Sequence, residues 1–242
     1  MSSPVASPVK LTAMYNAHQE LGAVFTHRGG WRLPARYTSA GEEMDLARKA
    51  AGVCDISPVG KLDLQGDAVL DELSRVLALQ GSLKVGRVVR CPNPTASEDG
   101  GDAVKVAGLS YDEAMVFTSS GEALSVAGFL EEGLDGCAHL VDVTSSWAGV
   151  CVLGPRSQSV LSRLVELDLD PAVFADGSCA QGKAAEVHVL VIRSDIGDLL
   201  AYEVYVTRDY GEYLWDALLH AGGSEGVGPI GVEALDGLRA GA

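Results

Sequence analysis

The 242-residue sequence contains few positively charged residues and no long apolar run. Its 18 lysines and arginines are outnumbered by 33 aspartates and glutamates, which gives a formal net charge of −15. Such a chain repels nucleic-acid phosphates and anionic lipid headgroups, so we expect neither as a partner. No apolar run reaches the roughly 18 residues of a membrane span, and residues 1–9 lack the pattern of a signal peptide. These absences predict a cytoplasmic protein.

Cysteine and histidine are also sparse and lie scattered along the chain. None of the five cysteines belongs to a Cys-x-x-Cys pair, and no two of the five histidines have the spacing of a metal site. We therefore predict no metal centre and interpret the cysteines as reduced, mostly buried residues. Hydrophobic residues make up 47% of the chain, enough to bury a core without disulfides.

The order of apolar patterns predicts an α+β fold of two similar halves. Between residues 61 and 143, short alternating strand patterns surround amphipathic helical patterns at 67–77 and 123–130. A comparable order returns between residues 149 and 220. Because a strand, helix, strand, strand, helix order is typical of a ferredoxin-like split βαβ unit, we expect two such halves with antiparallel sheets.

Local motifs refine this expectation. Ser39 and Glu42 fit a helix capping box, whereas the glycines and the proline of residues 29–34 predict a shaped loop. The polar residues 92–102 are the best candidate for a mobile loop. We expect one domain over residues 1–242, in which a subdomain of residues 53–144 is inserted into another made of residues 1–52 and 145–242.

Three separated stretches carry motifs that occur together in one known family. Residues 27–57 contain a Gly-Trp pair, a proline and tyrosine, a glutamate-containing helix and an Asp-x-Ser turn. Residues 142–157 contain Asp-Val-Thr-Ser-Ser-Trp and Gly-Pro-Arg-Ser, and residues 193–239 contain Tyr-Glu-Val-Tyr and Pro-Ile-Gly-Val-Glu. In this order the stretches resemble the folate-binding domain of the aminomethyltransferase family, the T-protein of the glycine cleavage system, without its C-terminal barrel domain.

The resemblance implies that tetrahydrofolate binds in a central channel lined by two carboxylates. Glu203 matches the glutamate that binds the pterin, because one carboxylate can accept two hydrogen bonds from adjacent ring donors. Asp112 matches the second acid of a Gly-Gly-x-x-Asp-Asp pattern and is the expected catalytic residue, with Tyr111 in place of the first acid. A solvent-facing strand glutamate and a turn aspartate are the alternative interpretations.

Three further side chains complete the folate site that the resemblance implies. Tyr111 and Trp31 would supply stacking faces, although large aromatic residues are more often core or loop anchors. Arg239 would substitute for a family arginine at the position that Leu235 occupies here.

The resemblance implies a tetrahydrofolate-dependent methyl or aminomethyl transferase that uses a small one-carbon donor. The alternative is a non-catalytic folate-binding or accessory subunit of a demethylase or amine oxidase, with another subunit supplying the C-terminal domain or a carrier. A folate-dependent iron–sulfur assembly factor is disfavoured, because residues 177–182 lack the lysine and tyrosine of that group's Lys-Gly-Cys-Tyr-x-Gly-Gln signature.

Overall fold

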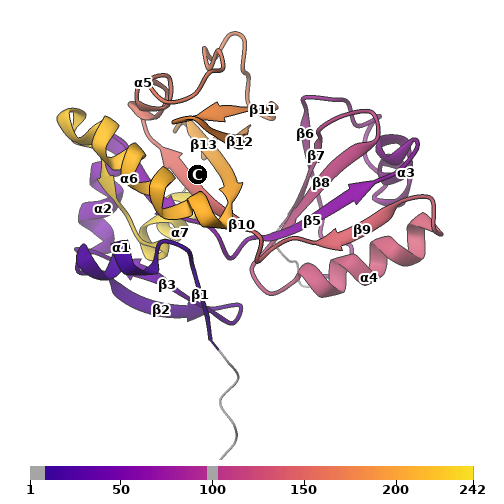
Figure 1. Cartoon of the computed structure of the whole chain (residues 1–242), viewed down its shortest axis with the longest axis horizontal. Helices are drawn as coiled ribbons and strands as arrows, with labels where there is room; N and C mark the ends of the chain where they lie inside the picture. The colour runs from indigo at the N-terminus through magenta and orange to yellow at the C-terminus, as the bar shows by residue number, and fades with distance from the viewer. Residues whose placement is uncertain (1–8, 97–102, 242) are drawn as a thin grey trace, which may run out of the picture.

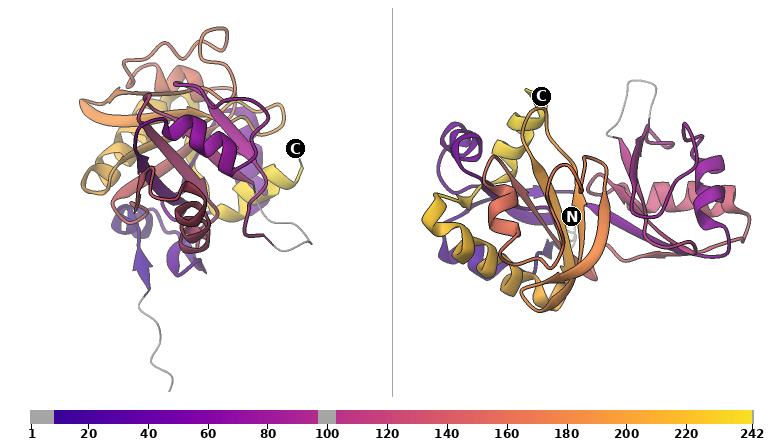
Figure 2. Two further views of the ribbon diagram at one scale, coloured as in Figure 1. Left: turned by 90° about the vertical axis from the view of Figure 1, so that its right-hand side faces the viewer. Right: turned by 90° about the horizontal axis from the view of Figure 1, so that it is seen from above.

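The computed structural model describes residues 9–96 and 103–241, which form three β-sheets and seven α-helices arranged in two lobes (Figure 1). We call residues 60–142 the small lobe and the rest of the described chain the large lobe. The two lobes also stand apart when the molecule is seen from above (Figure 2). Residues 97–102 of the polar loop that was expected to be mobile lie outside the described residues.

The small lobe is a five-stranded antiparallel sheet covered on one face by two helices. Along the sheet its strands are β6 (Val88–Cys91), β7 (Val104–Gly108), β8 (Glu113–Thr118), β5 (Gly60–Gln65) and β9 (His139–Asp142). Helices α3 (Val69–Val76) and α4 (Ala123–Leu134) bury their apolar sides against Leu62, Leu64 and Val116. Without the edge strand β6, this is the strand order of the split βαβ unit.

The large lobe contains a six-stranded sheet that repeats this order. Its strands are β11 (Cys179–Ala184), β12 (Val187–Arg193), β13 (Ala201–Thr207), β10 (Trp147–Leu153), β4 (Gly52–Asp55) and β14 (Gly228–Pro229). In space, the order β12, β13, β10, β4 corresponds to β7, β8, β5, β9 of the small lobe, although β4 precedes β10 in the chain and β9 follows β5. The expectation of purely antiparallel sheets is wrong at the edge strand β14, which pairs with β4 in parallel. Helices α5 (Ser157–Leu161) and α6 (Gly211–Gly222) cover the sheet. The expected α+β fold with two related halves is thus confirmed.

The chain passes between the lobes at points slightly different from those expected. Residue 53, the expected boundary, falls inside β4, which pairs with β10 in the large lobe. The small lobe begins at β5 and ends at β9, so residues 56–59 and 143–146 are the two connections. The sequence pattern misses this because β4 is a short, fully buried strand without polar alternation.

A three-stranded sheet near the N-terminus completes the large lobe. It contains β1 (Lys10–Leu11), β3 (Trp31–Arg36) and β2 (Val24–Arg28), with α1 (Tyr15–Glu20) between β1 and β2 in the chain. The expectation of a loop at residues 29–34 is therefore wrong beyond Gly30. Only the two glycines form a turn, with φ of 54° and 80°. Pro34 is tolerated in β3 because it lies beside a register shift in β2.

Two helices of the large lobe that are distant in the sequence pack against each other. Helix α2 (Ala40–Lys49) begins with the predicted capping box of Ser39 and Glu42. Helix α7 (Val232–Ala240) packs against α2 and contributes Leu235 and Leu238 to a core shared by both lobes. That shared core also contains Phe117 of the small lobe. As a result, α7 lies where the two sheets meet.

The cysteines are free and most of them are buried, as the sequence analysis expects. All five cysteines are free thiols, four of them buried, and Cys137 is exposed. Burial raises the pKa of the Cys151 thiol to about 12.

In the part of the chain that the structure describes, no helix combines the length and apolar character needed to cross a bilayer.

Candidate functional site

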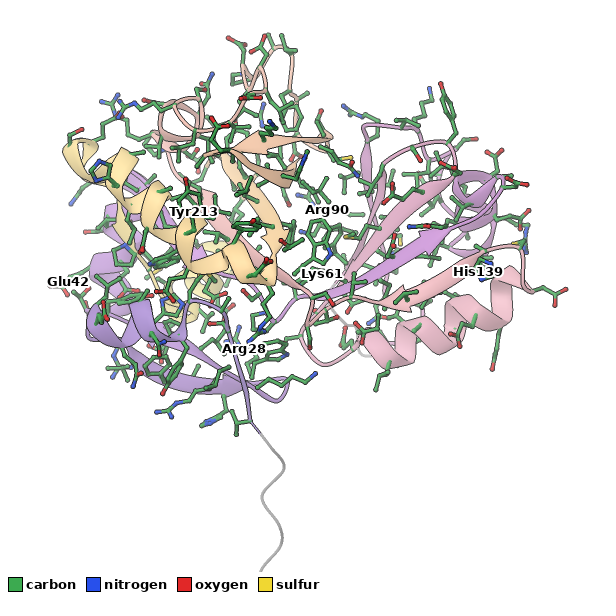
Figure 3. The ribbon with its side chains drawn as sticks, in the orientation of Figure 1. Arg28, Glu42, Lys61, Arg90, His139 and Tyr213 are labelled. Carbon is green, nitrogen blue, oxygen red and sulfur yellow. The ribbon has the colours of Figure 1, made fainter. Side chains whose placement is uncertain are left out.

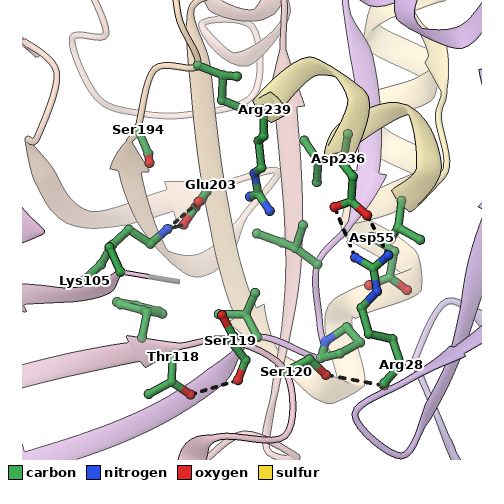
Figure 4. A pocket seen from close by; sticks show the side chains of 18 of the residues that line it. Arg28, Asp55, Lys105, Thr118, Ser119, Ser120, Ser194, Glu203, Asp236 and Arg239 are labelled. Carbon is green, nitrogen blue, oxygen red and sulfur yellow. Dashed lines mark hydrogen bonds and ion pairs between the residues drawn. The ribbon is translucent and has the colours of Figure 1, made fainter. Parts of the chain in front are cut away.

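A pocket of about 880 Å³ opens where the two lobes meet (Figure 4). Its walls come from β7 and β8 of the small lobe and from β13 and α7 of the large lobe, and the connection that follows β4 also contributes. A cavity of this size lies within the range of about 300–1,000 Å³ that accommodates small organic ligands. Because both lobes contribute side chains, the site depends on how the lobes pack.

Glu203 is the buried carboxylate of this pocket. It lies in the middle of β13, between β10 and β12, and is 3% exposed. Tyr202 and Val204 pack into the opposite core, so the strand alternation turns Glu203 toward the pocket. This location excludes the alternative of a solvent-facing strand glutamate.

The partners of Glu203 keep its carboxylate ionised. The Lys105 ammonium donates to both carboxylate oxygens, and the Tyr205 hydroxyl donates to Oε2 at 2.9 Å. Burial alone would raise the pKa of Glu203, but the charge and hydrogen bonds of Lys105 and the charge of Arg239 lower it. The pocket therefore contains a fixed negative charge that accepts hydrogen bonds.

Phe117 contributes an apolar lining next to this charge, with Tyr205 packed behind it outside the pocket lining. The rings of Phe117 and Tyr205 stack across the lobes with centroids 4.8 Å apart. The Lys105 ammonium lies 5.7 Å from the centre of the Phe117 ring. This combination of an ionised acceptor and an apolar lining suits a ligand that presents hydrogen-bond donors at one edge.

Asp55 is a second buried carboxylate at the pocket, and the sequence analysis did not identify it as a site residue. Its Oδ2 accepts a hydrogen bond from His18 Nε2 at 3.0 Å, and its Oδ1 accepts from the Ser57 backbone N–H at 2.8 Å. The Tyr37 hydroxyl lies 2.8 Å from His18 Nδ1. Burial raises the pKa of Asp55, but the hydrogen bonds and charge of His18 outweigh it and lower the pKa.

Lys61 lies near the start of β5, at the point where the chain enters the small lobe (Figure 3). The side chain is fully buried, and Nζ donates to the backbone carbonyls of Ser57 at 2.8 Å and Val59 at 2.7 Å. Burial lowers the pKa of Lys61 to about 7, although the negative charges of Asp55 and other carboxylates oppose the shift. Near neutral pH, the buried Lys61 side chain is therefore close to the point at which it loses its proton.

This burial predicts a pH-dependent contribution of Lys61 to stability. Between about pH 7 and the unfolded-state pKa of about 10.4, the unfolded chain binds an additional proton, so raising the pH stabilises the folded state. We expect the stability difference between wild type and Lys61→Met to shift in favour of wild type from pH 7 to pH 9. Urea unfolding of both proteins at the two pH values tests this. A difference that does not change with pH would contradict it.

Paired and polar side chains form the remaining walls. Arg28 Nη2 lies 2.6 Å from Asp236 Oδ2, which links the β2–β3 hairpin to α7. Arg90 donates to the Ser194 hydroxyl at 2.8 Å, and Arg239 is an exposed cation at the edge of the pocket (Figure 4). Within residues 9–96 and 103–241, no three His, Cys, Asp or Glu side chains gather as a metal site would require.

Of the five residues expected at the folate site, the structure brings only Glu203 and Arg239 to the pocket. Trp31 is 2% exposed and packs in β3 below the Lys10 ammonium, as the core-anchor interpretation proposed. Tyr111 is 86% exposed, and Asp112 is an exposed turn residue whose side chain accepts a hydrogen bond from Ser110.

The direction of the β7–β8 hairpin explains why Tyr111 and Asp112 lie outside the pocket. Thr118 at the end of β8 lines the pocket, whereas Asp112 precedes the start of the same strand. Six strand residues span about 20 Å, so the hairpin turn is far from the cavity. The positions expected to act beside the ligand thus lie at the opposite end of the sheet.

Two other positions of the hairpin were missed by the sequence analysis. Lys105 in β7 reaches Glu203, and Ala103 at the N-terminal side of β7 lines the pocket. The residues before Ala103 are Gly100, Gly101 and Asp102, which lie outside the described residues. A search for two glycines and an acid directly before a strand would have selected this stretch rather than the one containing Asp112.

Comparisons with known proteins show which family this chain resembles. A model of the GCVT N-terminal domain matches residues 14–242. An aminomethyltransferase of Halothermothrix orenii is 29% identical, over 96% of this chain and 64% of its own length. Sarcosine oxidase subunit alpha of Rhizobium meliloti is 30% identical, over 96% of this chain and 25% of its own length.

A solved structure shares the fold at low sequence identity. The aminomethyltransferase T of the glycine cleavage system from Bartonella henselae matches with a TM-score of 0.80 at 23% identity, over 96% of this chain and 62% of that one. The chain therefore spans less than two thirds of the length of these aminomethyltransferases. On the match that extends over nearly all of its residues, the chain belongs to the GCVT N-terminal domain family.

Proposed function

We propose that the pocket binds tetrahydrofolate and that the protein transfers a methyl or aminomethyl unit between this cofactor and a small donor. The observation that carries the proposal is Glu203, an ionised carboxylate buried in a pocket of about 880 Å³ that Phe117 also lines. Membership of the GCVT N-terminal domain family supports it.

The residues of the pocket fit a reduced folate. Once the Lys105 ammonium moves aside, Glu203 can accept hydrogen bonds from the ring N–H and the amino group of the pterin, and Phe117 offers an apolar lining. Arg239 at the open edge can pair with a carboxylate of the ligand. When bound, the cofactor would supply the nucleophilic nitrogens that accept the one-carbon unit.

Replacement of Glu203 by glutamine tests folate binding. We expect Glu203→Gln to raise the dissociation constant for tetrahydrofolate at least about tenfold, because a charge-assisted hydrogen bond is worth about 1.5–3 kcal/mol. Anaerobic calorimetric titration of the purified chain gives the constant. Asp112→Asn is the matched control, since it neutralises an aspartate outside the pocket and is expected to leave binding unchanged.

An unchanged dissociation constant in Glu203→Gln would exclude the proposed role of this residue. The catalytic role expected for Asp112 stays a separate prediction, and its place in the hairpin turn does not favour direct action on a ligand in the pocket. Transfer assays with Asp112→Asn at saturating cofactor test it, because a catalytic role requires turnover to fall while binding is retained.

A second candidate function is an accessory subunit that binds folate for a multi-subunit amine oxidase or demethylase. The similarity to a sarcosine oxidase subunit over nearly the whole chain favours this candidate. Tetrahydrofolate binding without turnover of any methyl or aminomethyl donor by the isolated chain would support it. In either case we propose a reducing, cytoplasmic environment, which agrees with five free cysteines.

A further inference from the structure

Lys105 and Glu203 form an ion pair that joins the two lobes across the pocket. Lys105 belongs to β7 of the small lobe, and Glu203 belongs to β13 of the large lobe. Only 15% of the Lys105 side chain and 4% of the Glu203 side chain are exposed. The ammonium contacts both carboxylate oxygens (Figure 4). Both acceptor atoms of the buried carboxylate are therefore already engaged.

This arrangement conflicts with direct recognition of a pterin by Glu203. The ring N–H and the amino group of a pterin need the same two oxygen atoms that the Lys105 ammonium contacts. Oε2 also accepts a hydrogen bond from Tyr205, so few lone pairs remain for a ligand. A ligand that binds Glu203 in two places must therefore displace the ammonium.

Displacement requires only a side-chain movement. The backbone of Lys105 is held by pairing with Arg90 on one side and Phe117 on the other. Its four-carbon chain is flexible, and it projects into a pocket that Ser194 and Asp195 also line. Tyr205 still donates to Glu203 when Lys105 leaves, so the carboxylate remains partly satisfied.

We propose that Lys105 is a specificity-determining residue, which competes with the ligand for Glu203 and admits only ligands that offer two adjacent hydrogen-bond donors. The inference rests on the proposed function, because the ligand considered is a reduced folate. Loss of an ordinary binding residue weakens ligand binding, whereas loss of Lys105 is expected to strengthen it. Removal of its charge strengthens binding, and a more strongly paired cation weakens it.

The test measures tetrahydrofolate affinity by anaerobic calorimetry in wild type, Lys105→Met and Lys105→Arg. Lys105→Met should lower the dissociation constant about tenfold, which corresponds to about 1.4 kcal/mol. Lys105→Arg should raise it, because the arginine fork pairs with a carboxylate in two places. Lys183→Met, a change in β11 outside the pocket, is the control and should bind as wild type does.

A double variant isolates the competition. In the Glu203→Gln background, Lys105→Met should produce no gain in affinity, because the two changes act through one ion pair. Lys105→Arg keeps the charge and the buried ion pair. If Lys105→Met does not fold, the expected rise of the dissociation constant in Lys105→Arg still tests the inference.

The possible outcomes separate the inference from the proposed function. Weaker or unchanged binding in Lys105→Met, or unchanged binding in Lys105→Arg, overturns the competition while folate binding stands. A gain in Lys105→Met that persists with Glu203→Gln also overturns it, since the effect would not pass through the carboxylate. Absence of binding in every folded variant overturns both the inference and the proposed function.

Discussion

Replacing His18 by alanine is expected to lower the free energy of unfolding by about 3–5 kcal/mol, because it leaves a buried carboxylate without its main partner. His18 and Asp55 are both fully buried, with Nε2 and Oδ2 3.0 Å apart. The change also removes the hydrogen-bond partner of the Tyr37 hydroxyl. Urea unfolding at pH 7 measures the loss. The exposed His188 provides the control, and His188→Ala should have little effect.

The pH dependence identifies the cause of this loss. Because the folded protein lowers the pKa of Asp55, its ionisation stabilises the fold above the unfolded-state pKa of about 3.9 and ceases to do so as the pH falls through the folded-state value. The difference between wild type and His18→Ala should therefore shrink below about pH 4. A difference that stays constant on acidification would attribute the loss to the cavity left by the imidazole.

Replacing Glu43 by alanine is expected to cause a loss of similar size, about 3–5 kcal/mol. Its buried carboxylate accepts three backbone N–H groups, those of Tyr37 at 2.6 Å, Thr38 at 2.8 Å and Gly231 at 2.7 Å. Gly231 immediately precedes α7, which lines the pocket. The affinity for the proposed cofactor, tetrahydrofolate, should therefore decrease together with stability.

The adjacent glutamate provides the matched control for this experiment. Glu42 caps the same helix from an exposed position, so Glu42→Ala should cost less stability and leave folate binding unchanged. Glu43→Gln keeps one acceptor oxygen and should fall between alanine and wild type. Thermal unfolding and calorimetric titration of the three variants check the order. Equal losses in Glu42→Ala and Glu43→Ala would contradict the proposed connection to α7.

Much of the fold could be predicted from the sequence because it depends on local patterns. The two helical patterns of the small lobe and the Ser39 capping box involve residues close together in the chain. Residues 29–34 were expected to be a loop because their glycines and Pro34 are typical of loops. Pairing with β2 instead makes residues from Trp31 onward a strand. The approximate lobe boundary differs from the structure by a few residues, because β4 finds its partner almost a hundred residues later in the chain.

The candidate site was predictable only in part. Glu203 and Arg239 were expected at the site through the family resemblance, since the strand pattern alone fits a solvent-facing glutamate equally well, and the structure places both at the pocket. Lys105, Asp55 and His18 were missed, since each acquires its role from a partner distant in sequence. The hydrophobic periodicity of one sequence does not indicate which distant residues form an ion pair.

Tyr111 and Asp112 illustrate a different limit. A motif match fixes residue types, but it does not determine which end of a hairpin faces the ligand. In this structure the pocket lies at the Thr118 end of β8, and both residues lie at the other end. The sequence pattern alone does not show which end of the β7–β8 hairpin lies at the pocket.

The two neighbouring connections between the lobes have a consequence for the order in which the protein folds. Asp55 pairs with Val150, and every strand pair of the small lobe lies within the chain between these two residues. Once the small lobe has formed, pairing of Leu62 with Asp142 holds its two ends together. The long loop that β4 and β10 must otherwise close is then effectively short, which reduces its entropic cost. Formation of the inserted lobe thereby lowers the entropic cost of pairing β4 with β10 in the surrounding sheet.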